Sequence, residues 1–346
     1  MSTKVDLKGK SILFFSVQTF NLENEIKNKL EQSGATVVYY DERPANNNFT
    51  KGIIRLERSL YQNKINSYYK KIQTDTKDKK IDYLFVNRGE VVPSFFLEQF
   101  SMLHPACKKI FYTWDSFTNH AHSTTILHFF DKRFTFDPED ARKYHIGFRP
   151  LFFLDKYKSI KESKSSNYTY DILFLGTAHS DRYLISNKIV KWGENNNLTS
   201  FCYYYMHGRF VYFYKWLFEK SFKGFDYKKL SFKSLNGDQI IELYNQSKVI
   251  LDINHPGQKG LTMRTFEAIG AGKKLITTNA EIKNYPFYNK TNILVIDRKN
   301  IKLNKDFFKD DYANISDDLY DKCSIEGWLN DIFLNEEDNV NFILKI

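Results

Sequence analysis

The segment from Gly260 to Asn279 holds the densest combination of glycine, charged and apolar residues in the chain. Its pattern predicts a loop, a helix from about Thr262 to Ala271 and a strand from Lys274 to Thr278. A glycine-bearing loop that enters a helix offers free backbone N–H groups and the positive end of the helix dipole to an anion. Arg264, in the first turn of this helix, adds a full positive charge. We therefore predict a phosphate site at this loop and Arg264.

Glu267 follows Arg264 by three residues, which places both side chains on one face of the predicted helix. From there the Glu267 carboxylate can accept two hydrogen bonds from a ribose diol beside the phosphate. The simpler alternative is that the two residues form a surface ion pair and that Gly272 only ends the helix.

A second candidate loop follows a predicted strand from Asp171 to Leu175. Gly176 allows the backbone to approach a ligand closely, and His179 and Arg182 come next, at the carboxyl end of the strand, where open α/β sheets bind ligands. Arg182 is therefore a second candidate phosphate ligand. The alternative is a loop that only caps the following helix, with Arg182 in solvent.

Two carboxylates in the first half of the chain also follow predicted strands. Glu90 comes after the strand Ile81 to Val86, and Asp115 after the strand Lys109 to Thr113. A carboxylate at such a position can act as a general base toward a hydroxyl group, although either residue can equally cap the next helix. We prefer Glu90 as the base because Gly89 frees the backbone beside it.

These loops require parallel sheets, and strands and helices alternate along both halves of the chain. In the first half we expect strands at Lys10–Val17, Thr36–Tyr40, Ile81–Val86, Lys109–Thr113 and Phe134–Phe136, with helices at Leu22–Gln32, Thr50–Lys71 and Pro93–Leu103 and another from Asp137 and Pro138. In the second half we expect strands at Asp171–Leu175, Ser200–Tyr205, Lys248–Ile253, Lys274–Thr278 and Asn292–Asp297, with helices at Arg182–Trp192, Gln239–Ser247 and Thr262–Ala271.

A chain of 346 residues exceeds one ordinary α/β domain and suits two. We expect a Rossmann-like domain over residues 1–155, a polar interdomain linker over 156–170 and a second Rossmann-like domain over 171–315. Residues 316–346 are expected to be helical and to pack back on the first domain.

Several familiar motifs are missing or misplaced. Gly9, Lys10 and Ser11 resemble the end of a P-loop but precede their strand, and no GxGxxG follows it, which argues against an NTPase and a dehydrogenase. His120, His122 and His128 lack a carboxylate to complete a metal site, and no Asp-x-Asp triplet ends a strand. We expect no metal and no cofactor, so protein groups must meet any pyrophosphate charge.

Composition narrows the partners and the location. The net charge is +10, but lysines are scattered and no nucleic-acid module is present, so we expect no nucleic-acid partner. No apolar run is long enough to span a bilayer, and Met1 to Lys10 has no signal-peptide core. Three cysteines without CxxC spacing fit a reducing compartment. We expect a cytoplasmic protein, with peripheral attachment at the cytoplasmic face of the inner membrane as an option.

The aromatic stretch Phe210 to Phe218, with lysines nearby, is apolar nearly all round. One interpretation is a buried helix. The other is an interfacial surface that dips toward anionic lipid, since aromatic rings and lysine stems suit the headgroup zone.

Three stretches together resemble the bacterial group 1 and spore-maturation-like glycosyltransferases of the GT-B fold. Gly260 to Asn279 resembles their donor-binding helix, Tyr170 to Arg182 (YDILFLGTAHSDR) their first C-terminal strand and phosphate loop, and Lys248 to Gln258 (KVILDINHPGQ) the strand before the donor helix. Shorter stretches of the first half, Thr113–Ser116, Phe136–Tyr144 and Phe148–Phe153, are similar to the same group.

The resemblance implies two Rossmann-like domains that face each other across a cleft. It also implies transfer of a sugar, without metal, from a nucleotide-sugar donor to a glycan or lipid-linked acceptor of a bacterial surface polysaccharide or lipopolysaccharide. The implied donor site comprises Gly176, His179, Arg182, Lys259, Gly260, Thr262, Arg264 and Glu267.

One position departs from the family pattern. Many members carry a glutamate, seven further residues and a second glutamate, whereas here Lys259 stands at the first position and Glu267 keeps the second. The donor sugar and a retaining outcome are therefore open, and inversion stays an option. Two other functions also remain open, a nucleotide-sugar 2-epimerase of the same fold and a non-catalytic sugar-nucleotide-binding scaffold of a polysaccharide assembly complex.

Overall fold

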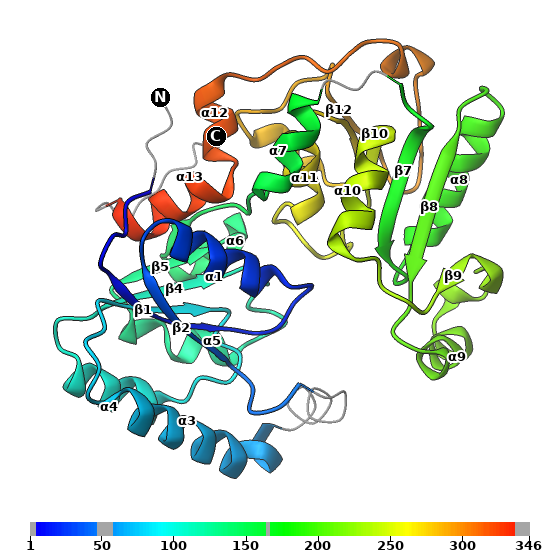
Figure 1. Ribbon diagram of the computed structural model, residues 1–346. Helices are drawn as coiled ribbons and strands as arrows, with labels where there is room; N and C mark the ends of the chain where they lie inside the picture. The colour runs from blue at the N-terminus through cyan, green and yellow to red at the C-terminus, as the bar shows by residue number, and fades with distance from the viewer. Residues whose placement is uncertain (1–4, 47–57, 164–166, 336–346) are drawn as a thin grey trace. The chain divides into compact units, whose positions relative to one another are not determined.

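The computed structural model describes residues 5–46, 58–163 and 167–335, and the chain folds into two compact units (Figure 1). Unit 1 comprises residues 5–150 together with 325–335, and unit 2 comprises residues 151–324. Each unit contains one parallel six-stranded sheet with its own core. The two Rossmann-like units predicted from the sequence are therefore confirmed.

The sheet of unit 1 has the strand order β2-β1-β3-β4-β5-β6, and all neighbours are parallel. Its strands are β1 (Ser11–Ser16), β2 (Thr36–Asp41), β3 (Tyr83–Asn87), β4 (Lys108–Thr113), β5 (Lys132–Thr135) and β6 (Gly147–Phe148). The two-residue β6 escaped prediction because so short a strand has no alternation to detect.

The helices of unit 1 fall largely where the periodicity places them. They are α1 (Leu22–Gln32), α3 (Gln62–Thr76), α4 (Ser94–Leu103), α5 (His122–Thr125) and α6 (Pro138–Tyr144), with 3₁₀ turns at Arg58–Tyr61 and Leu127–Phe129. Asp137 caps α6 by accepting from the backbone N–H groups of Glu139 and Asp140. The expected start of the second helix, residues 50–57, lies outside the described residues.

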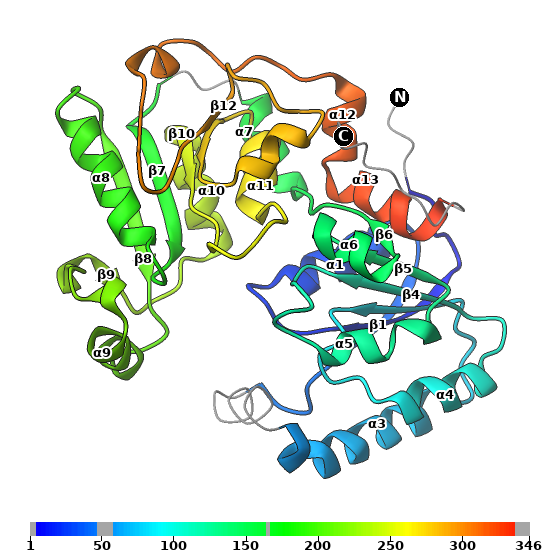
Figure 2. The same ribbon diagram turned by 180° about the vertical axis from the view of Figure 1, so that it is seen from behind.

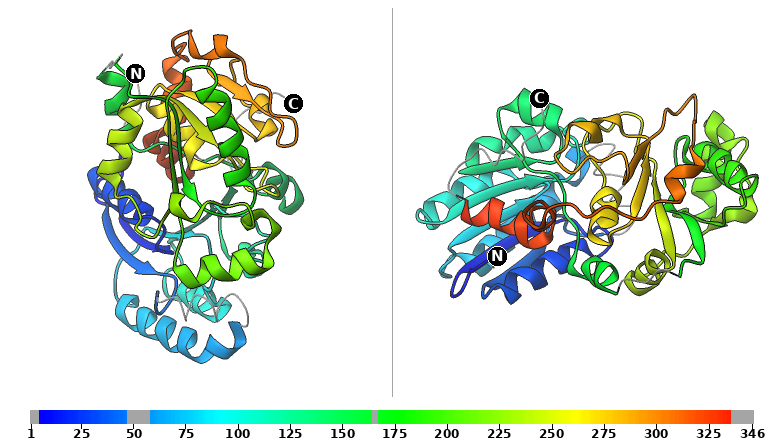
Figure 3. Two further views of the ribbon diagram at one scale, coloured as in Figure 1. Left: turned by 90° about the vertical axis from the view of Figure 1, so that its right-hand side faces the viewer. Right: turned by 90° about the horizontal axis from the view of Figure 1, so that it is seen from above.

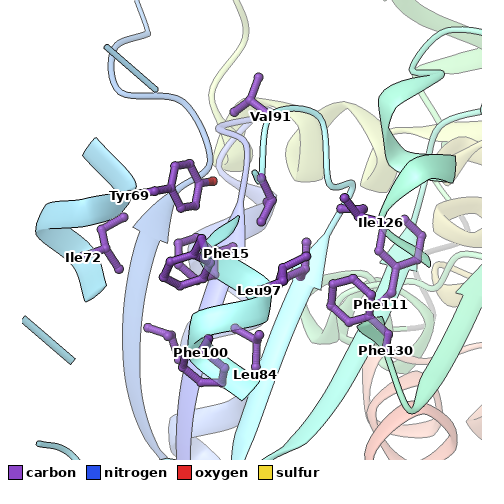
Figure 4. Close-up of a cluster of buried hydrophobic side chains, with 14 of the residues drawn as sticks. Phe15, Tyr69, Ile72, Leu84, Val91, Leu97, Phe100, Phe111, Ile126 and Phe130 are labelled. Atoms are coloured by element: carbon purple, nitrogen blue, oxygen red, sulfur yellow. The ribbon is translucent and has the colours of Figure 1, made fainter. Parts of the chain in front are cut away.

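One face of this sheet is closed by α3 and α4, as the close-up in Figure 4 shows. Aromatic rings carry much of the contact, because Phe15 packs against Tyr69 at 5.7 Å and against Phe96 at 5.5 Å between ring centroids. The other face receives a late segment of the chain, α13 (Ile325–Leu329) and a π-helical turn (Asn330–Leu334). Here the fully buried Trp328 meets Tyr112 edge to face.

The sheet of unit 2 has the order β12-β11-β10-β7-β8-β9, again with parallel neighbours (Figure 2). Its strands are β7 (Tyr170–Thr177), β8 (Ser200–Tyr205), β9 (Leu230–Ser231), β10 (Ser247–Asp252), β11 (Lys274–Thr277) and β12 (Ile293–Val295). The helices α8 (Arg182–Glu194) and α10 (Gly237–Asn245) cover opposite faces (Figure 3, left). Further helices are α7 (Asp155–Glu162), α9 (Arg209–Phe218), α11 (Met263–Gly270) and α12 (Asp317–Lys322).

Two sequence interpretations need correction. The first part of the expected linker, residues 156–170, is the helix α7, which ends at Glu162, belongs to unit 2 and buries Tyr157 and Ile160. These two residues are spaced for one helical face, but the surrounding lysines and serines hid the pattern. The aromatic stretch Phe210 to Phe218 forms α9, none of whose residues is buried, so the interpretation as a core helix is wrong.

Within the described residues, no helix has the length and apolar character required to cross a bilayer.

Candidate functional site

The candidate donor site lies at the carboxyl edge of the sheet of unit 2. Asp252 at the end of β10 is in register with Thr277 at the end of β11, and β7 flanks β10 on its other side. The loops that leave these strands therefore emerge side by side. This brings the end of β7 with the loop Ala178–Asp181 and the start of α11 to one edge, as the sequence predicted.

Arg182 begins α8 and is held by backbone oxygens of this edge. Its Nε donates to the carbonyl oxygen of Ile253 at 2.8 Å, and its Nη1 donates to that of Thr177 at 3.3 Å. Burial, and next the positive charge of Arg264, lower the pKa of Arg182 to about 10. The two guanidinium groups are therefore close enough to repel each other where little water screens their charges. A bound anion would reduce this repulsion.

Arg264 is the second cation of the pair. Burial disfavours its charge, but Tyr244, Glu267 and Asp252 together outweigh this effect and raise its pKa. Its Nε atom is buried and makes no hydrogen bond to the described part of the chain. A buried donor without a partner costs free energy, so this N–H is available to a ligand oxygen.

Glu267 lies one turn further along α11 and remains half-buried. Its Oε2 accepts from the buried hydroxyl of Tyr244 at 2.8 Å. The pKa of Tyr244 is raised well above its usual value, first by burial and then by the charge of Glu267, so the hydroxyl stays a donor. The predicted surface ion pair of Glu267 with Arg264 is not a contact that the structure shows; instead Tyr244 orients the carboxylate.

Asp252 ties the start of α11 to the sheet. Its Oδ2 accepts from the hydroxyls of Thr262 at 2.8 Å and Thr265 at 3.3 Å. The hydroxyl of Thr262, a predicted donor-site residue, is therefore engaged in orienting the helix, although its backbone still leads into the first turn.

Arg298 joins the site without having been predicted. Its Nη1 donates to both carboxylate oxygens of Asp181, at 2.7 and 2.9 Å, and its Nη2 donates to Oδ1 of Asn254 at 2.7 Å. This arginine therefore fixes the loop after β7 to the loop after β10. The available signal was its place directly after the predicted strand Asn292–Asp297, at the same carboxyl edge.

Gly176, near the end of β7, and His179, in the loop after it, complete this edge. Burial, followed by the charge of Arg182, lowers the pKa of His179 to about 3, so its imidazole is neutral at physiological pH. A Cβ atom on Gly176 would lie 2.9 Å from the ring of Phe174 and 3.4 Å from Nη1 of Arg182. The glycine thus makes room for the guanidinium group rather than for a turn of the backbone.

Lys259 and Gly260 lie in the loop before α11. The Nζ of Lys259 is 3.7 Å from Oε1 of Glu281, and both side chains are partly exposed. The carbonyl oxygen of Gly260 accepts from Nε2 of Gln258 at 2.9 Å. Side chains of the loop itself and of the segment after β11 therefore shape this loop, since Nδ2 of Asn279 also donates to the carbonyl oxygen of Lys259 at 3.0 Å.

A second polar cluster lies at the carboxyl edge of the sheet of unit 1 and contains both predicted catalytic carboxylates. Glu90 is buried, and its Oε2 lies 2.5 Å from Nη2 of Arg43 and 3.7 Å from Nε of Arg88. Glu90 is thus neutralised by arginines and shielded from water, which disfavours the predicted role of general base.

Asp115 is the more accessible of the two, with 30% of its side chain exposed. It lies 3.1 Å from Nε2 of His120 and accepts from Nδ2 of Asn119 at 2.8 Å. Burial raises its pKa, but the hydrogen bond from His120 and the charge of Arg88 outweigh this and bring the pKa to about 2. The pairing of His120 with Asp115 was not predicted from the sequence.

The turn that carries Glu90 is strained. Arg88 and Gly89 both have positive φ, at 104° and 68°, and Arg88 also contacts Nε2 of His120. The fully buried Glu42 holds the turn by accepting from the backbone N–H of Gly89 at 2.8 Å and of Glu90 at 2.6 Å. A bulky residue in this backbone region costs free energy and persists where its surroundings enforce it.

No group of three or more potential metal ligands occurs among residues 5–46, 58–163 and 167–335. Nε2 of His122 donates to the carbonyl oxygen of Val92 at 2.8 Å.

Comparison with known proteins adds a family match and two solved structures. Residues 196–308, all in unit 2, match the family described as "Glycosyl transferase-like". An alpha-glucosyltransferase in complex with UDP and a 13-mer DNA containing an A:G mismatch is 12% identical, with a TM-score of 0.56 over 92% of this chain and 94% of that chain. A glycosyltransferase from Rickettsia africae ESF-5 is also 12% identical, with a TM-score of 0.52 over 97% and 96%.

None of the curated proteins matches the sequence. The two parallel six-stranded sheets and the two structural matches together show that the chain has the GT-B fold, with a glycosyl transferase-like segment in unit 2.

Proposed function

We propose that this protein is a glycosyltransferase that binds a nucleotide-sugar donor at the carboxyl edge of unit 2. The observation that carries the proposal is the pair Arg182 and Arg264, two partly dry guanidinium groups, one of which presents an Nε–H without a partner. A diphosphate would accept from both groups and neutralise their repulsion.

The residues around the pair define how a donor is held. The first turn of α11 points backbone N–H groups and the positive end of the helix dipole toward the same place. Glu267, oriented by Tyr244, accepts from the ribose hydroxyls. As the glycosidic bond to the donor breaks, negative charge grows on the leaving diphosphate, and fixed positive groups stabilise that charge.

We assign the acceptor side to the carboxyl edge of unit 1. Asp115 orients His120, and an imidazole held by a carboxylate is better matched to accept a proton from a hydroxyl than a carboxylate with a pKa of about 2. Glu90, paired with Arg43 and Arg88, then positions this pair rather than serving as the base. The acceptor we propose is a glycan or lipid-linked precursor of a bacterial surface polysaccharide or lipopolysaccharide.

We further propose that transfer needs no metal, because the arginines supply positive charge where a cation would otherwise neutralise the diphosphate. Turnover should then continue in EDTA. Loss of turnover in EDTA, with recovery on addition of Mg²⁺ or Mn²⁺, would overturn this part of the proposal.

The first test is calorimetric titration of the protein with UDP, the nucleotide bound by the structurally similar alpha-glucosyltransferase. GDP, ADP and TDP extend the titration to other bases. Arg182→Gln should reduce the affinity about tenfold or more, because a hydrogen bond to a charged group contributes roughly 1.5–3 kcal/mol. Lys191→Gln, an equal charge change in the last turn of the same helix, is the control. Equal affinities of the two variants would contradict the site.

A second measurement separates the remaining functions. Release of UDP from UDP-sugar only when a glycan acceptor is present supports transfer. Conversion of the UDP-sugar to its 2-epimer without acceptor would indicate an epimerase, and binding without either reaction would indicate a scaffold.

A further inference from the structure

The helix α9 exposes apolar side chains to solvent and turns polar ones toward unit 2, which is the opposite of what is expected for a surface helix. Phe210 is 92% exposed, Phe213 60% and Phe218 65%, and Tyr214 and Leu217 are exposed beside them. The side chains turned toward unit 2 are Tyr212, Lys215 and Glu219, spaced as one helical face. A soluble helix buries its apolar face, whereas here the apolar face meets the solvent.

The inner face of α9 is anchored by specific contacts. Tyr212 packs on Tyr227 with ring centroids 5.1 Å apart, and Nζ of Lys215 lies 5.2 Å from the centroid of the Phe222 ring. These contacts fix the outer face in place. Figures 1 and 2 show α9 projecting beyond the carboxyl ends of β7 and β8, apart from the helices that cover the sheet.

Positive charge surrounds the apolar face. The stretch Arg209 to Lys233 contains seven lysines or arginines and two acidic residues, so that half of the net charge of +10 lies in these 25 residues. Lys220, Lys223 and Lys228 are exposed. Aromatic rings with adjacent lysines match an anionic lipid surface, where rings occupy the headgroup zone and ammonium groups meet phosphates.

We propose that α9 and the lysines of residues 209–233 dock this protein on an anionic lipid bilayer, with the outer aromatic face of α9 inserted among the headgroups. Charge complementarity decides between this occupant and a second copy of the chain, because two copies meeting through α9 would bring two clusters of like charge together.

The docking surface is on the same side of unit 2 as the donor site. The charge of Lys215 is among those that act on His179 in the loop after β7. Docking would thus hold the donor site next to the membrane. The inference itself does not require the proposed function, since lipid binding and sugar transfer are measured separately.

The test is cosedimentation of the full chain with vesicles of phosphatidylglycerol and phosphatidylcholine in equal parts, against vesicles of phosphatidylcholine alone. We expect binding to the anionic vesicles only, weakened at high salt because exposed charges are screened. Absence of binding to anionic vesicles at low salt would overturn the proposal.

Two variants locate the surface. Phe210→Ser/Phe213→Ser removes two exposed rings, and Lys220→Glu/Lys223→Glu reverses two exposed charges; each should reduce vesicle affinity about tenfold or more. The matched controls are Met102→Ser, 73% exposed in α4, and Lys70→Glu/Lys71→Glu in α3. Equal losses in the controls would show that binding depends on overall charge or stability rather than on α9.

Fluorescence quenching tests whether α9 inserts into the bilayer, and sedimentation velocity tests whether the protein associates with itself. Trp216 is 43% exposed in α9, so lipids brominated near the headgroup should quench part of the tryptophan fluorescence, and Trp216→Phe should abolish that quenching. Sedimentation velocity without lipid completes the test. A dimer that Phe210→Ser/Phe213→Ser dissociates, together with unquenched Trp216, would assign the face to a second copy instead. UDP titration of each variant shows that the donor site is intact.

Discussion

Arg264 and Glu267 share one turn of α11, yet their surroundings give them different tasks. Arg264 has an unpartnered buried Nε, whereas Glu267 already accepts from the hydroxyl of Tyr244. A ligand can therefore complete the hydrogen bonding of Arg264 and share the carboxylate of Glu267. This difference allows the role of each residue to be tested by a separate substitution.

Glu267→Ala should weaken UDP binding about tenfold or more while the protein stays folded, because the lost contact is a charged hydrogen bond to the ligand. Calorimetric titration measures the affinity, and circular dichroism the fold. Tyr244→Phe is the matched control, since it removes the partner hydroxyl and keeps the carboxylate. Tyr244→Phe should weaken UDP binding less than Glu267→Ala, because the carboxylate is still present, and an unchanged affinity of Glu267→Ala would contradict the ligand contact.

The position of a site residue could be predicted where the sequence pattern places that residue after a strand. Arg182, Arg264 and Glu267 follow periodic segments, and the parallel register brings them to one edge. The pairing of Arg298 with Asp181 was not predictable, because 117 residues separate them and no local pattern reports that contact. The burial of Glu90 by Arg43 depends likewise on a partner 47 residues away.

At the scale of elements, Gly270 decides how closely α11 approaches the chain before α7. A Cβ atom there would lie 2.5 Å from Cγ of Phe153, whose ring is fully buried. Gly270→Ala should therefore lower the free energy of unfolding by about 1–3 kcal/mol, the usual cost of overpacking. Chemical denaturation measures this loss. Gly224→Ala, where the nearest atom to an added Cβ is Cδ2 of Leu184 at 4.0 Å, should change stability by less than about 0.5 kcal/mol.

The buried Glu42, which holds the turn after β3, should make the stability of the protein depend on pH. Burial, opposed by the backbone hydrogen bonds from Gly89 and Glu90, raises the pKa of Glu42 from 4.5 to about 8. Between these values the folded protein holds a proton that the unfolded chain has lost. The contribution of Glu42 to stability is therefore complete below pH 4.5 and declines as the pH rises to about 8.

Glu42→Gln removes this titration and keeps a side chain of the same shape. The free energy of unfolding of the natural protein minus that of the variant should decrease by more than about 1 kcal/mol between pH 5 and pH 8, since each pKa unit corresponds to about 1.4 kcal/mol. Urea denaturation at several pH values measures the difference. A difference that stays constant with pH would mean that Glu42 is ionised throughout.

The prediction of elements succeeded where a regular apolar face packs on a core, and failed where that face is narrow or directed at solvent. The helix α1 buries Ile26 and Leu30 and has the polar residues Lys27, Asn28 and Lys29 between them, which is the pattern that periodicity detects. The helix α7 buries only Tyr157 and Ile160 among lysines, and α9 exposes its apolar side chains. Hydrophobicity in sequence cannot distinguish an apolar face directed at a core from one directed at solvent.

At the scale of the whole molecule, the separate cores of the two units predict how the chain unfolds. Each unit buries its own core, with Phe15, Leu84 and Phe111 in one and Ile172, Leu251 and Ile276 in the other. Domains with separate cores can unfold in separate transitions, so calorimetry should resolve two. All proposed donor ligands belong to unit 2.

UDP should therefore raise the transition of unit 2 and leave that of unit 1 nearly unchanged. At 100 times its dissociation constant a ligand adds about 2.7 kcal/mol to the stability of the species that binds it, which for about 170 residues corresponds to roughly 6–10 °C. Hydrogen exchange of the backbone amides shows which unit UDP stabilises. On addition of UDP, protection of the amides should increase in α8 and α11. It should stay constant in α3 and α4, which pack on the core of unit 1. Equal protection of α3 and α11 would show that the nucleotide stabilises both units and that the donor site is not confined to unit 2.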